Sequence, residues 1–489
     1  MNTLRAPSRS ALPKRPETSW RFRLLLLLAM MALLCTVLIL NAGPIYFIDS
    51  AGLLNSGIQT LKAAGMLHHA PSAPGPIGSL PTHTNQPHDT YVVAGRSAYL
   101  GMAMFGAGKL LGSAGFALLQ ALLTVALLDR TLDRFGWSRG ASRIRLVLVL
   151  VIATPLSFFV AVLLADHLFS LMILSVALLT VEEQPRRILM LGAVIALTLL
   201  AHYGALMLLV LIAPAALLLR WLAGRPPRLA SLVLAGAAAI GLSGQLLFTA
   251  AVEHKMGRPP VTIPTVLARL VEDGPATDLL RKDCAHDPHR WYTCRFADRL
   301  PMTEERFLWS ADPRTGAYGT LPPPLRARIS AEEGAIVARA VADAPLRTVR
   351  SSLRHAAEQM VMVDIRDFAV TRSLPSQMPP APNPYARADY RSLVDTAPHW
   401  ALLASRLYLV VFLASIAALV VALILRRRSL PRAQRDFAAV ILLSLLASAA
   451  LHASVVGPYP RYQARVAWLA TLAAVIVIAA RSPRPDARR

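Results

Sequence analysis

Charged residues are scarce in this chain of 489 residues: they make up 16% of it, whereas hydrophobic residues make up 55%. An apolar surplus of this size excludes an ordinary soluble domain, because one such domain cannot bury it. Acidic residues are the rarer sign, with 28 Asp and Glu against 51 Lys and Arg. Long hydrophobic runs take the place of charge, and they indicate a membrane protein.

The apolar runs are each close to the roughly 20 residues that a helix needs to cross hydrocarbon. They cover residues 24–40, 110–128, 146–164, 229–252, 407–425, 437–456 and 466–480. Two longer blocks, 146–181 and 188–222, are interrupted by the polar pairs Asp166-His167 and His202-Tyr203. We read each block as a hairpin of two short helices, with the polar pair at the outer surface or in a cavity. The sequence therefore predicts an all-α polytopic membrane protein with about ten transmembrane helices and a mainly helical periplasmic domain.

The net charge of +23 lies mainly between the apolar runs. Basic residues gather before residue 24, at 130–145, 186–187, 220–228 and 426–435, and after residue 480. The short segments on the other side hold Lys62, Arg96, Arg461 and Arg465. By the positive-inside rule, both termini are predicted to be cytoplasmic in a bacterial inner (cytoplasmic) membrane. This distribution argues against nucleic-acid binding and for contact with the lipid bilayer.

Cysteine is nearly absent, with three residues in the whole chain. Cys35 lies inside the first run, and Cys284 and Cys294 lie ten residues apart in the predicted outer domain. A disulfide between the latter two suits an oxidising periplasm, and two free thiols are the alternative.

The chain divides into five predicted parts. A disordered cytoplasmic leader, 1–23, precedes a membrane domain, 24–252, with seven spans and a first outer loop at 43–97. A periplasmic domain at 253–398, three further spans at 399–482 and a cytoplasmic tail at 483–489 follow. The first run has the size of a cleaved signal peptide, but its long leader and its poor cleavage site favour an uncleaved anchor.

Local patterns predict three helices outside the spans. Residues 50–67 place Leu54, Ile58 and Leu61 on one face, which suits a helix lying along the membrane surface, and 70–90 read as a loop. Within the outer domain, the string at 330–333 fits a capping box that opens a helix, and a second helix is expected over 346–363.

Two acidic residues are the main candidates for chemistry. Asp49 follows the first span, where a carboxylate at the water boundary can act as a general base, or simply cap the next helix. Asp166 stands in the first polar pair with His167, and His202 occupies the corresponding place in the second pair. Carboxylates from separate outer turns can converge on one cleft, and capping of the turns is the alternative.

Arg461, Tyr462 and Arg465 lie in the predicted outer turn before the last span. Guanidinium groups at this depth are suited to gripping a phosphate, and snorkelling to lipid headgroups is the alternative. Two weaker groups are also present. The first is a set of aromatic residues that stand among acidic ones and fit either sugar binding or a domain core: Trp291, Tyr292, Phe307 and Trp309 beside Glu304, Glu305 and Asp312. The second is a set of four histidines that lack the spacing of a metal site: His68, His69, His83 and His88.

This layout resembles the GT-C class of membrane glycosyltransferases, which use polyprenyl-phosphate-linked sugars as donors. The resemblance rests on Asp49 after the first span, the helix expected over 50–67, the string Gly95-Arg96-Ser97-Ala98-Tyr99, Asp166 in a second outer loop and the pair Arg461-Tyr462. Ser50 stands where the family pattern has a second acidic residue, so a metal ion is not assigned.

The resemblance implies a transferase that takes a sugar from a polyprenyl-phosphate-linked donor on the periplasmic face. Asp49 is then the general base, Asp166 orients the acceptor or a divalent cation, and Arg96 and Arg461 neutralise the departing lipid phosphate. Substrate contacts are expected from Tyr99, His167, His202, Tyr462 and Arg465. Two other functions remain open: a transporter or flippase of a lipid-linked substrate, and a polysaccharide polymerase or ligase that does not need Asp49.

Overall fold

The computed structural model describes residues 20–67, 92–94, 97–137, 140–310, 312–369 and 392–479. The helices that precede the outer domain are α1 (Trp20–Leu34), α2 (Thr36–Leu40), α3 (Ile48–Ala63), α4 (Ala98–Leu111), α5 (Gly115–Arg134), α6 (Gly140–Ala153), α7 (Leu156–Ala161), α8 (Asp166–Leu179), α9 (Pro185–Ala201), α10 (Gly204–Leu222) and α11 (Arg228–Met256). They are followed by α12 (Thr265–Asp273), α13 (Pro275–His286), η1 (Tyr292–Arg299), α14 (Glu304–Trp309), η2 (Tyr318–Thr320), α15 (Pro323–Asp343), α16 (Pro345–Met360), η3 (Arg366–Phe368), α18 (Leu393–Thr396), α19 (Pro398–Leu425), α20 (Arg432–Val455) and α21 (Pro460–Ile478). Among the described residues, two short parallel strands, β1 (Val93–Ala94) and β2 (Val261–Thr262), complete the fold.

The prediction of a helical fold is confirmed, and the long apolar helices are consistent with a multi-pass membrane protein. Six described helices are long and apolar enough to cross a membrane: α5, α10, α11, α19, α20 and α21. The predicted count of about ten spans is not confirmed. Two of the apolar runs are broken, since the run 110–128 crosses the end of α4 at Gly112, and the run 146–164 contains Pro155, where α6 has ended and α7 begins.

The two polar interruptions have different outcomes. The break at His202-Tyr203 is confirmed, because α9 ends at Ala201 and α10 begins at Gly204. Asp166 and His167 are expected at the outer surface or in a cavity, and the structure places them just after the break between the two helices. Both residues open α8 and are buried, with exposed fractions of 6% and 0%. The interruption itself is the short segment 162–165 before them.

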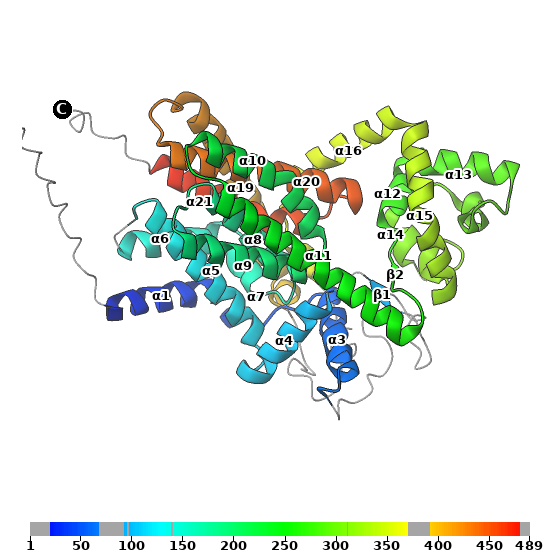
Figure 1. Ribbon diagram of the computed structural model, residues 1–489, viewed down its shortest axis with the longest axis horizontal. Coiled ribbons are helices and arrows are strands. Elements are labelled where there is room, and N and C mark those ends of the chain that lie inside the picture. Colours follow the sequence, from blue (N-terminus) through cyan, green and yellow to red (C-terminus); the bar gives the residue numbers. More distant parts are fainter. Residues whose placement is uncertain are drawn as a thin grey trace, which may run out of the picture.

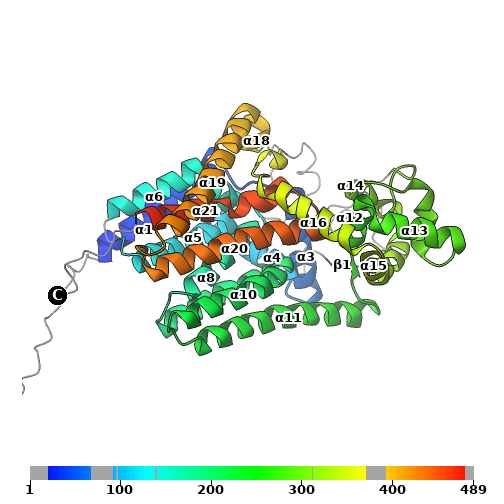
Figure 2. The ribbon, with the colours of Figure 1, turned by 90° about the horizontal axis from the view of Figure 1, so that it is seen from above.

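The molecule has two parts, which Figures 1 and 2 show at opposite ends of its long axis. The long helices form one bundle, and α12 to α15 form a smaller domain with a separate hydrophobic core, which we call the small domain (residues 261–343). The described ends of the chain, Trp20 and Ala479, both lie at the end of the bundle away from the small domain (Figure 1). This arrangement places both described chain ends, which border basic segments in the sequence, at one end.

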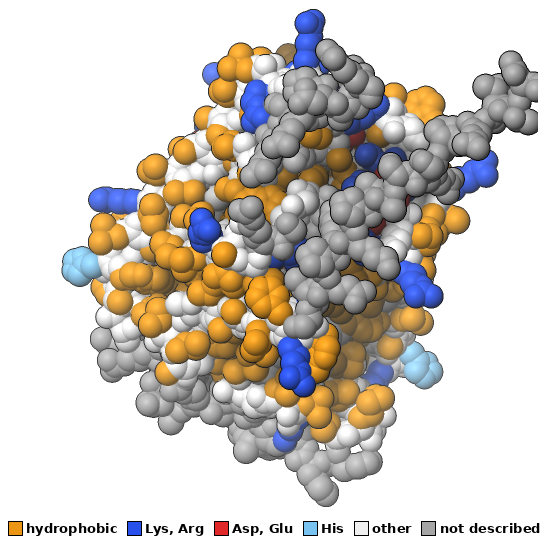
Figure 3. All heavy atoms as spheres, turned by 90° about the vertical axis from the view of Figure 1, so that its left-hand side faces the viewer, with side chains coloured by type: hydrophobic (Ala, Val, Ile, Leu, Met, Phe, Trp, Pro, Cys, Tyr) orange, Lys and Arg blue, Asp and Glu red, His pale blue; other side chains and the backbone are white. Residues whose placement is uncertain are grey.

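The end of the bundle that carries both termini has a largely hydrophobic surface dotted with basic side chains (Figure 3). Several of the arginines there are paired with the few acids. Arg143 binds both Asp129 and Asp133, and Arg23 of α1 donates to Asp129 over 2.8 Å. These pairs tie α1, α5 and α6 together where the helices end.

Two glycines make a close contact between α3 and α4. A Cβ atom on Gly101 would lie 2.0 Å from the backbone oxygen of Leu53, and one on Gly57 would lie 2.1 Å from the backbone carbon of Gly101. Real Cβ atoms do not approach this closely, so only glycine permits this spacing. The helix predicted over 50–67 is present as α3, and its apolar face, with Leu54 and Ile58, is buried.

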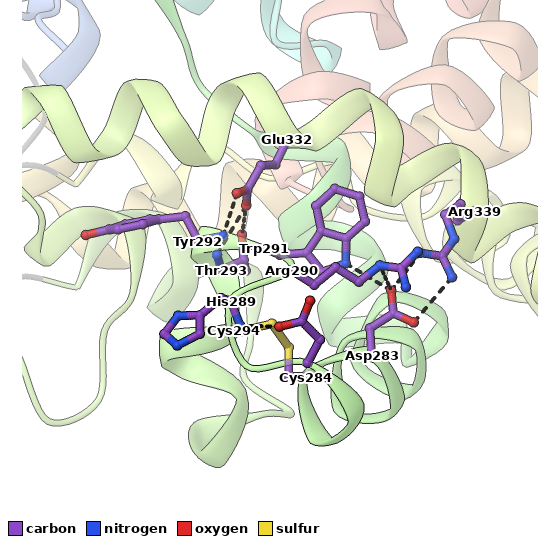
Figure 4. The surroundings of a disulfide bond; sticks show 11 residues. Asp283, Cys284, His289, Arg290, Trp291, Tyr292, Thr293, Cys294, Glu332 and Arg339 are labelled. Atoms are coloured by element: carbon purple, nitrogen blue, oxygen red, sulfur yellow. Dashed lines mark hydrogen bonds and ion pairs between the residues drawn. A yellow bond between two sulfur atoms is a disulfide. The ribbon is translucent and has the colours of Figure 1, made fainter.

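The small domain is held by its own core and by a disulfide between Cys284 of α13 and Cys294 of η1. Asp283 beside the disulfide accepts hydrogen bonds from the Trp291 indole over 2.9 Å and from Arg339 of α15 over 2.7 Å (Figure 4). Phe307 is fully buried, and Trp291, Tyr292 and Trp309 pack against the same core. These contacts favour the core interpretation of the aromatic group over sugar binding.

The prediction that a helix begins at Ser330 is wrong, because α15 begins at Pro323. The two glutamates of the supposed capping box serve other segments instead. Glu333 accepts hydrogen bonds from the backbone N–H groups of Val266 and Leu267 at the start of α12, and Glu332 accepts from those of Tyr292 and Thr293. The helix predicted over 346–363 is confirmed as α16, which packs against α20 of the bundle.

Substitution of Gly101 by Ala should force α3 and α4 apart and lower the free energy of unfolding by about 1–3 kcal/mol. Gly106 of the same helix has no atom within 4 Å of a built Cβ, so Gly106→Ala is the matched control. The control should be neutral or stabilising by up to about 1 kcal/mol, since Ala favours helix more than Gly. Thermal unfolding of the purified variants in detergent measures both. Equal stability of the two variants would contradict the close contact.

Candidate functional site

Two non-helical segments from different parts of the chain pair inside the bundle. The Ile45 N–H donates to the Ala161 carbonyl over 2.9 Å, and the Leu163 N–H donates to the Ile45 carbonyl over 3.0 Å. Backbone groups that leave a helix in an apolar environment need such partners. The pairing therefore joins the segment before α3 to the segment before α8.

Ser50 fixes the start of α3 against the same segment. Its hydroxyl accepts a hydrogen bond from the Phe47 N–H over 2.9 Å and donates to the Leu163 carbonyl over 2.8 Å. Phe47 is the N-cap residue of α3. Asp49 therefore does not cap this helix, which was the alternative role for it. Asp49 lies in the first turn of α3 and Asp166 in the first turn of α8, and the two helix starts lie side by side.

The last helix supplies the positive charges. Pro460 occupies the first turn of α21, and Arg461 and Arg465 follow one helical turn apart. Residues with this spacing lie on the same helix face, so both guanidinium groups reach toward the starts of α3 and α8. The carboxylates and arginines predicted to act together are thus brought into one cluster.

The outer ion pair is partly accessible. Arg461 Nη1 lies 3.0 Å from Asp49 Oδ2, with the two side chains 19% and 28% exposed. The guanidinium carbon lies 4.8 Å from the Phe47 ring centre and 5.0 Å from the Tyr462 ring centre. The aromatic faces hold the guanidinium beside Asp49 and leave part of the pair open to an approaching ligand.

The inner ion pair is buried. Arg465 Nη1 donates to Asp166 Oδ1 over 2.5 Å, with side-chain exposures of 0% and 9%. Arg465 Nη2 lies 2.6 Å from His452 Nε2, and its guanidinium carbon lies 3.9 Å from the Phe169 ring centre. A charge pair in such surroundings must be well bonded, because removal of one partner strands the other in an apolar interior.

Tyr462 connects the two pairs. Its ring centre is also 5.0 Å from the guanidinium carbon of Arg465, so the ring contacts both arginines. His452 packs on the same ring, with the centroids 4.6 Å apart. His202 reaches the inner pair more loosely, 3.5 Å from Arg465 Nη1.

Two polar atoms of the inner group have no hydrogen-bond partner among the described residues. They are the Arg465 Nε and the His202 Nδ1. Buried polar groups are normally satisfied, so these two atoms retain capacity for a further hydrogen bond.

The remaining predicted residues have other places. Tyr99 donates its hydroxyl to the Gly244 carbonyl over 2.8 Å and ties α4 to α11. His167 turns away from the arginines, toward Thr124 of α5 at 2.6 Å and the Trp468 ring. Arg96 and the histidines His68, His69, His83 and His88 lie outside the described residues.

Residues missed by the sequence interpretation complete the surroundings. His452 interrupts the apolar run 437–456, which was a usable signal. The positive charge of Arg461 also acts on Asp367, whose pKa is raised because loss of hydration outweighs the opposing effect of that arginine. Tyr459 and Glu304 meet across the boundary with the small domain, where the tyrosine hydroxyl lies 2.9 Å from Glu304 Oε2. Nothing in the sequence pattern joins these last two.

Metal ligands are not gathered in the described part of the chain. Among these residues, no group of three or more His, Cys, Asp and Glu side chains is placed to hold a metal ion. Asp49 and Asp166 each bind a guanidinium instead.

Comparison of the chain with protein-family models, with curated proteins and with solved structures finds no match.

The two ion pairs should differ in their effect on stability. Asp166→Asn leaves Arg465 charged and buried, and should lower the free energy of unfolding by about 3–5 kcal/mol. Asp49→Asn, at the accessible pair, is the matched control and should cost at most about 1 kcal/mol.

Denaturant or thermal unfolding in detergent measures both variants. A double variant, Asp166→Asn with Arg465→Gln, removes both buried charges and should regain much of the lost stability. Equal effects of Asp49→Asn and Asp166→Asn would contradict the division into an accessible and a buried pair.

Proposed function

We propose that this chain is a membrane glycosyltransferase that moves a sugar from a polyprenyl-phosphate donor to a hydroxyl acceptor. The observation that carries the proposal is the accessible Asp49–Arg461 pair, which stands beside a second, buried pair at the end of the bundle nearer the small domain. A carboxylate that accepts a proton and a guanidinium that binds phosphate are the two groups such a transfer needs.

Binding of the donor begins with an exchange of partners. The lipid phosphate replaces Asp49 on Arg461, since a phosphate offers a guanidinium the same bidentate contact as a carboxylate and more charge. The Asp49 carboxylate is thereby released beside the bound donor. The resting ion pair keeps both charges compensated until the donor arrives.

Transfer then proceeds by displacement at the anomeric carbon. The acceptor oxygen attacks that carbon as Asp49 takes its hydroxyl proton, so a new carbon–oxygen bond forms. The bond from the anomeric carbon to the phosphate oxygen breaks, and the lipid phosphate leaves with the electron pair. Arg461 compensates the charge that develops on the leaving phosphate.

The inner pair has a supporting role in this scheme. From the sequence, Asp166 is expected to orient the acceptor or a cation. In this scheme Asp166 holds Arg465 instead, because its carboxylate is bonded to that arginine and buried. Arg465 and His452 pack on Tyr462 and keep Arg461 in place. Charge compensation of the phosphate is assigned to Arg461, and the proposal requires no divalent cation.

The orientation of the protein follows from the distribution of basic residues. We place the bundle end with both termini in the cytoplasm and the small domain in the periplasm of a bacterial inner membrane. The site near the small domain then faces lipid-linked donors on the periplasmic side. The Cys284–Cys294 disulfide supports this orientation, since disulfides persist in oxidising compartments.

Asp49→Asn should lower transfer by at least about 100-fold, because a positioned general base contributes about 10²–10⁴ to the rate. The test uses proteoliposomes that contain tritiated polyprenyl-phosphate-linked hexoses, with release of polyprenyl phosphate and label in product as readouts. Asp278→Asn is the matched control, since Asp278 of the small domain forms an exposed ion pair with Arg347 of α16. The control should keep full activity.

Other outcomes distinguish the alternatives. Normal transfer by a folded Asp49→Asn variant would overturn the proposed function. Activity that depends on Arg461 but not on Asp49 would indicate a polysaccharide polymerase or ligase. Movement of the intact lipid-linked sugar across the bilayer, without a covalent product, would indicate a flippase.

A further inference from the structure

The turn between α20 and α21 leads into the helix that carries the two arginines, and it contacts the small domain. It comprises residues 456–459, and Arg461 follows it by two positions. Gly457 has a φ of +109°, and a Cβ atom built there would lie 3.1 Å from both Arg269 Nη1 and Glu304 Oε2. Two side chains of the small domain therefore lie directly against the turn.

Tyr459 is fixed on its backbone and on its side chain. The Gln359 side chain of α16 accepts a hydrogen bond from the Tyr459 N–H and donates one to the Tyr459 carbonyl, each over 2.9 Å. The Tyr459 hydroxyl donates to Glu304 Oε2 over 2.9 Å. Since burial raises the pKa of Tyr459, its hydroxyl stays protonated and remains the donor.

Glu304 lies in a buried position that is short of free positive charge. The charge of Arg269 in α12 acts on Glu304, but its guanidinium binds Asp273 over 2.6 Å and lies 3.4 Å from Glu272. Glu272 and Glu305 add negative charge around Glu304. Burial is the largest cause that raises the pKa of Glu304 to about 7, and the Tyr459 hydrogen bond and Arg269 oppose it.

Tyr459 reaches the ion pairs through aromatic contact. The rings of Tyr459 and Tyr462 meet edge to face, with centroids 5.9 Å apart. Tyr462 in turn contacts the guanidinium groups of Arg461 and Arg465. A shift of Tyr459 would move the first turn of α21, and with it the group that binds Asp49.

We propose that Glu304 and Tyr459 form a clamp through which the small domain positions Arg461 and Arg465, and that protonation of Glu304 tightens the clamp. Both residues act as positioning residues, because neither touches the ion pairs directly. The part of the inference that concerns substrate rests on the proposed function. The part that concerns the turn does not.

The direction of the pH effect follows from the burial of Glu304. The docked turn covers Glu304 Oε2 and removes it from water, so the pKa of about 7 belongs to the docked state, and release of the turn lowers the pKa. Docking therefore takes up a proton. The stabilisation that this proton contributes is greatest at acidic pH and declines as the pH rises toward 7, and the docking equilibrium falls by at most about tenfold per pH unit.

Hydrogen exchange of the full chain in lipid nanodiscs tests the clamp without an activity assay. Protection of residues 456–462, corrected for intrinsic exchange, should fall between pH 5 and pH 7.5 in the native protein. Glu304→Gln keeps an acceptor for Tyr459 and removes the titration, so protection should be high and independent of pH. Tyr459→Phe should lower protection at every pH.

Controls separate the clamp from general stability and from other polar groups of the same network. Tyr318→Phe removes a buried hydroxyl that donates to the Thr262 carbonyl in the same domain over 3.2 Å, and should leave protection of the turn unchanged. His355 lies 2.8 Å from Asp273 and 2.6 Å from Arg269, so it faces the same network. Persistence of the pH dependence in Glu304→Gln would place its origin outside Glu304 and overturn the proposal, as would unchanged protection in Tyr459→Phe.

The transfer assay adds a readout for substrate. If the proposed function holds, Tyr459→Phe should raise the KM for the polyprenyl-phosphate-linked donor at least fivefold with a smaller change in kcat, because the phosphate-binding arginine is displaced and the base is not. A fall in kcat with an unchanged KM would contradict a positioning role. Since exchange needs no turnover, failure of the clamp and failure of the transferase assignment give different results.

Discussion

Pairing of two non-helical segments inside the bundle is the constraint on which the candidate site depends. Chain that leaves a helix among apolar side chains must find hydrogen-bond partners for its backbone, and Ile45 finds them on Ala161 and Leu163. The pairing fixes where α3 and α8 begin. Their first turns carry the two carboxylates, and one face of α21 then serves both of them.

Burial divides the charges of the site into two kinds. The Asp166–Arg465 pair is sealed and bonded to His452, which suits a fixed support. The Asp49–Arg461 pair is partly open, which suits exchange of one anion for another. The turn before α21 is bonded to Glu304 through Tyr459. The small domain therefore contacts the chain directly before the accessible Arg461.

Polarity within apolar surroundings let the sequence predict part of the fold and several residues that the structure brings together in the candidate site. Asp49, Asp166, Arg461 and Arg465 stood out because charge is costly there, and α11, α19, α20 and α21 matched their apolar runs. Contacts between distant segments could not be predicted, so the Tyr459–Glu304 link was missed. The helix start at Ser330 was misplaced because Glu332 and Glu333 bond to segments elsewhere in the domain, which no local pattern records.

A structure of the protein with polyprenyl phosphate bound in lipid nanodiscs tests the central claim most directly. The account predicts the phosphate within hydrogen-bond distance of Arg461, the Asp49 carboxylate released from that guanidinium, and the Asp166–Arg465 pair unchanged. A phosphate bound elsewhere, with the Asp49–Arg461 pair still closed, would contradict it.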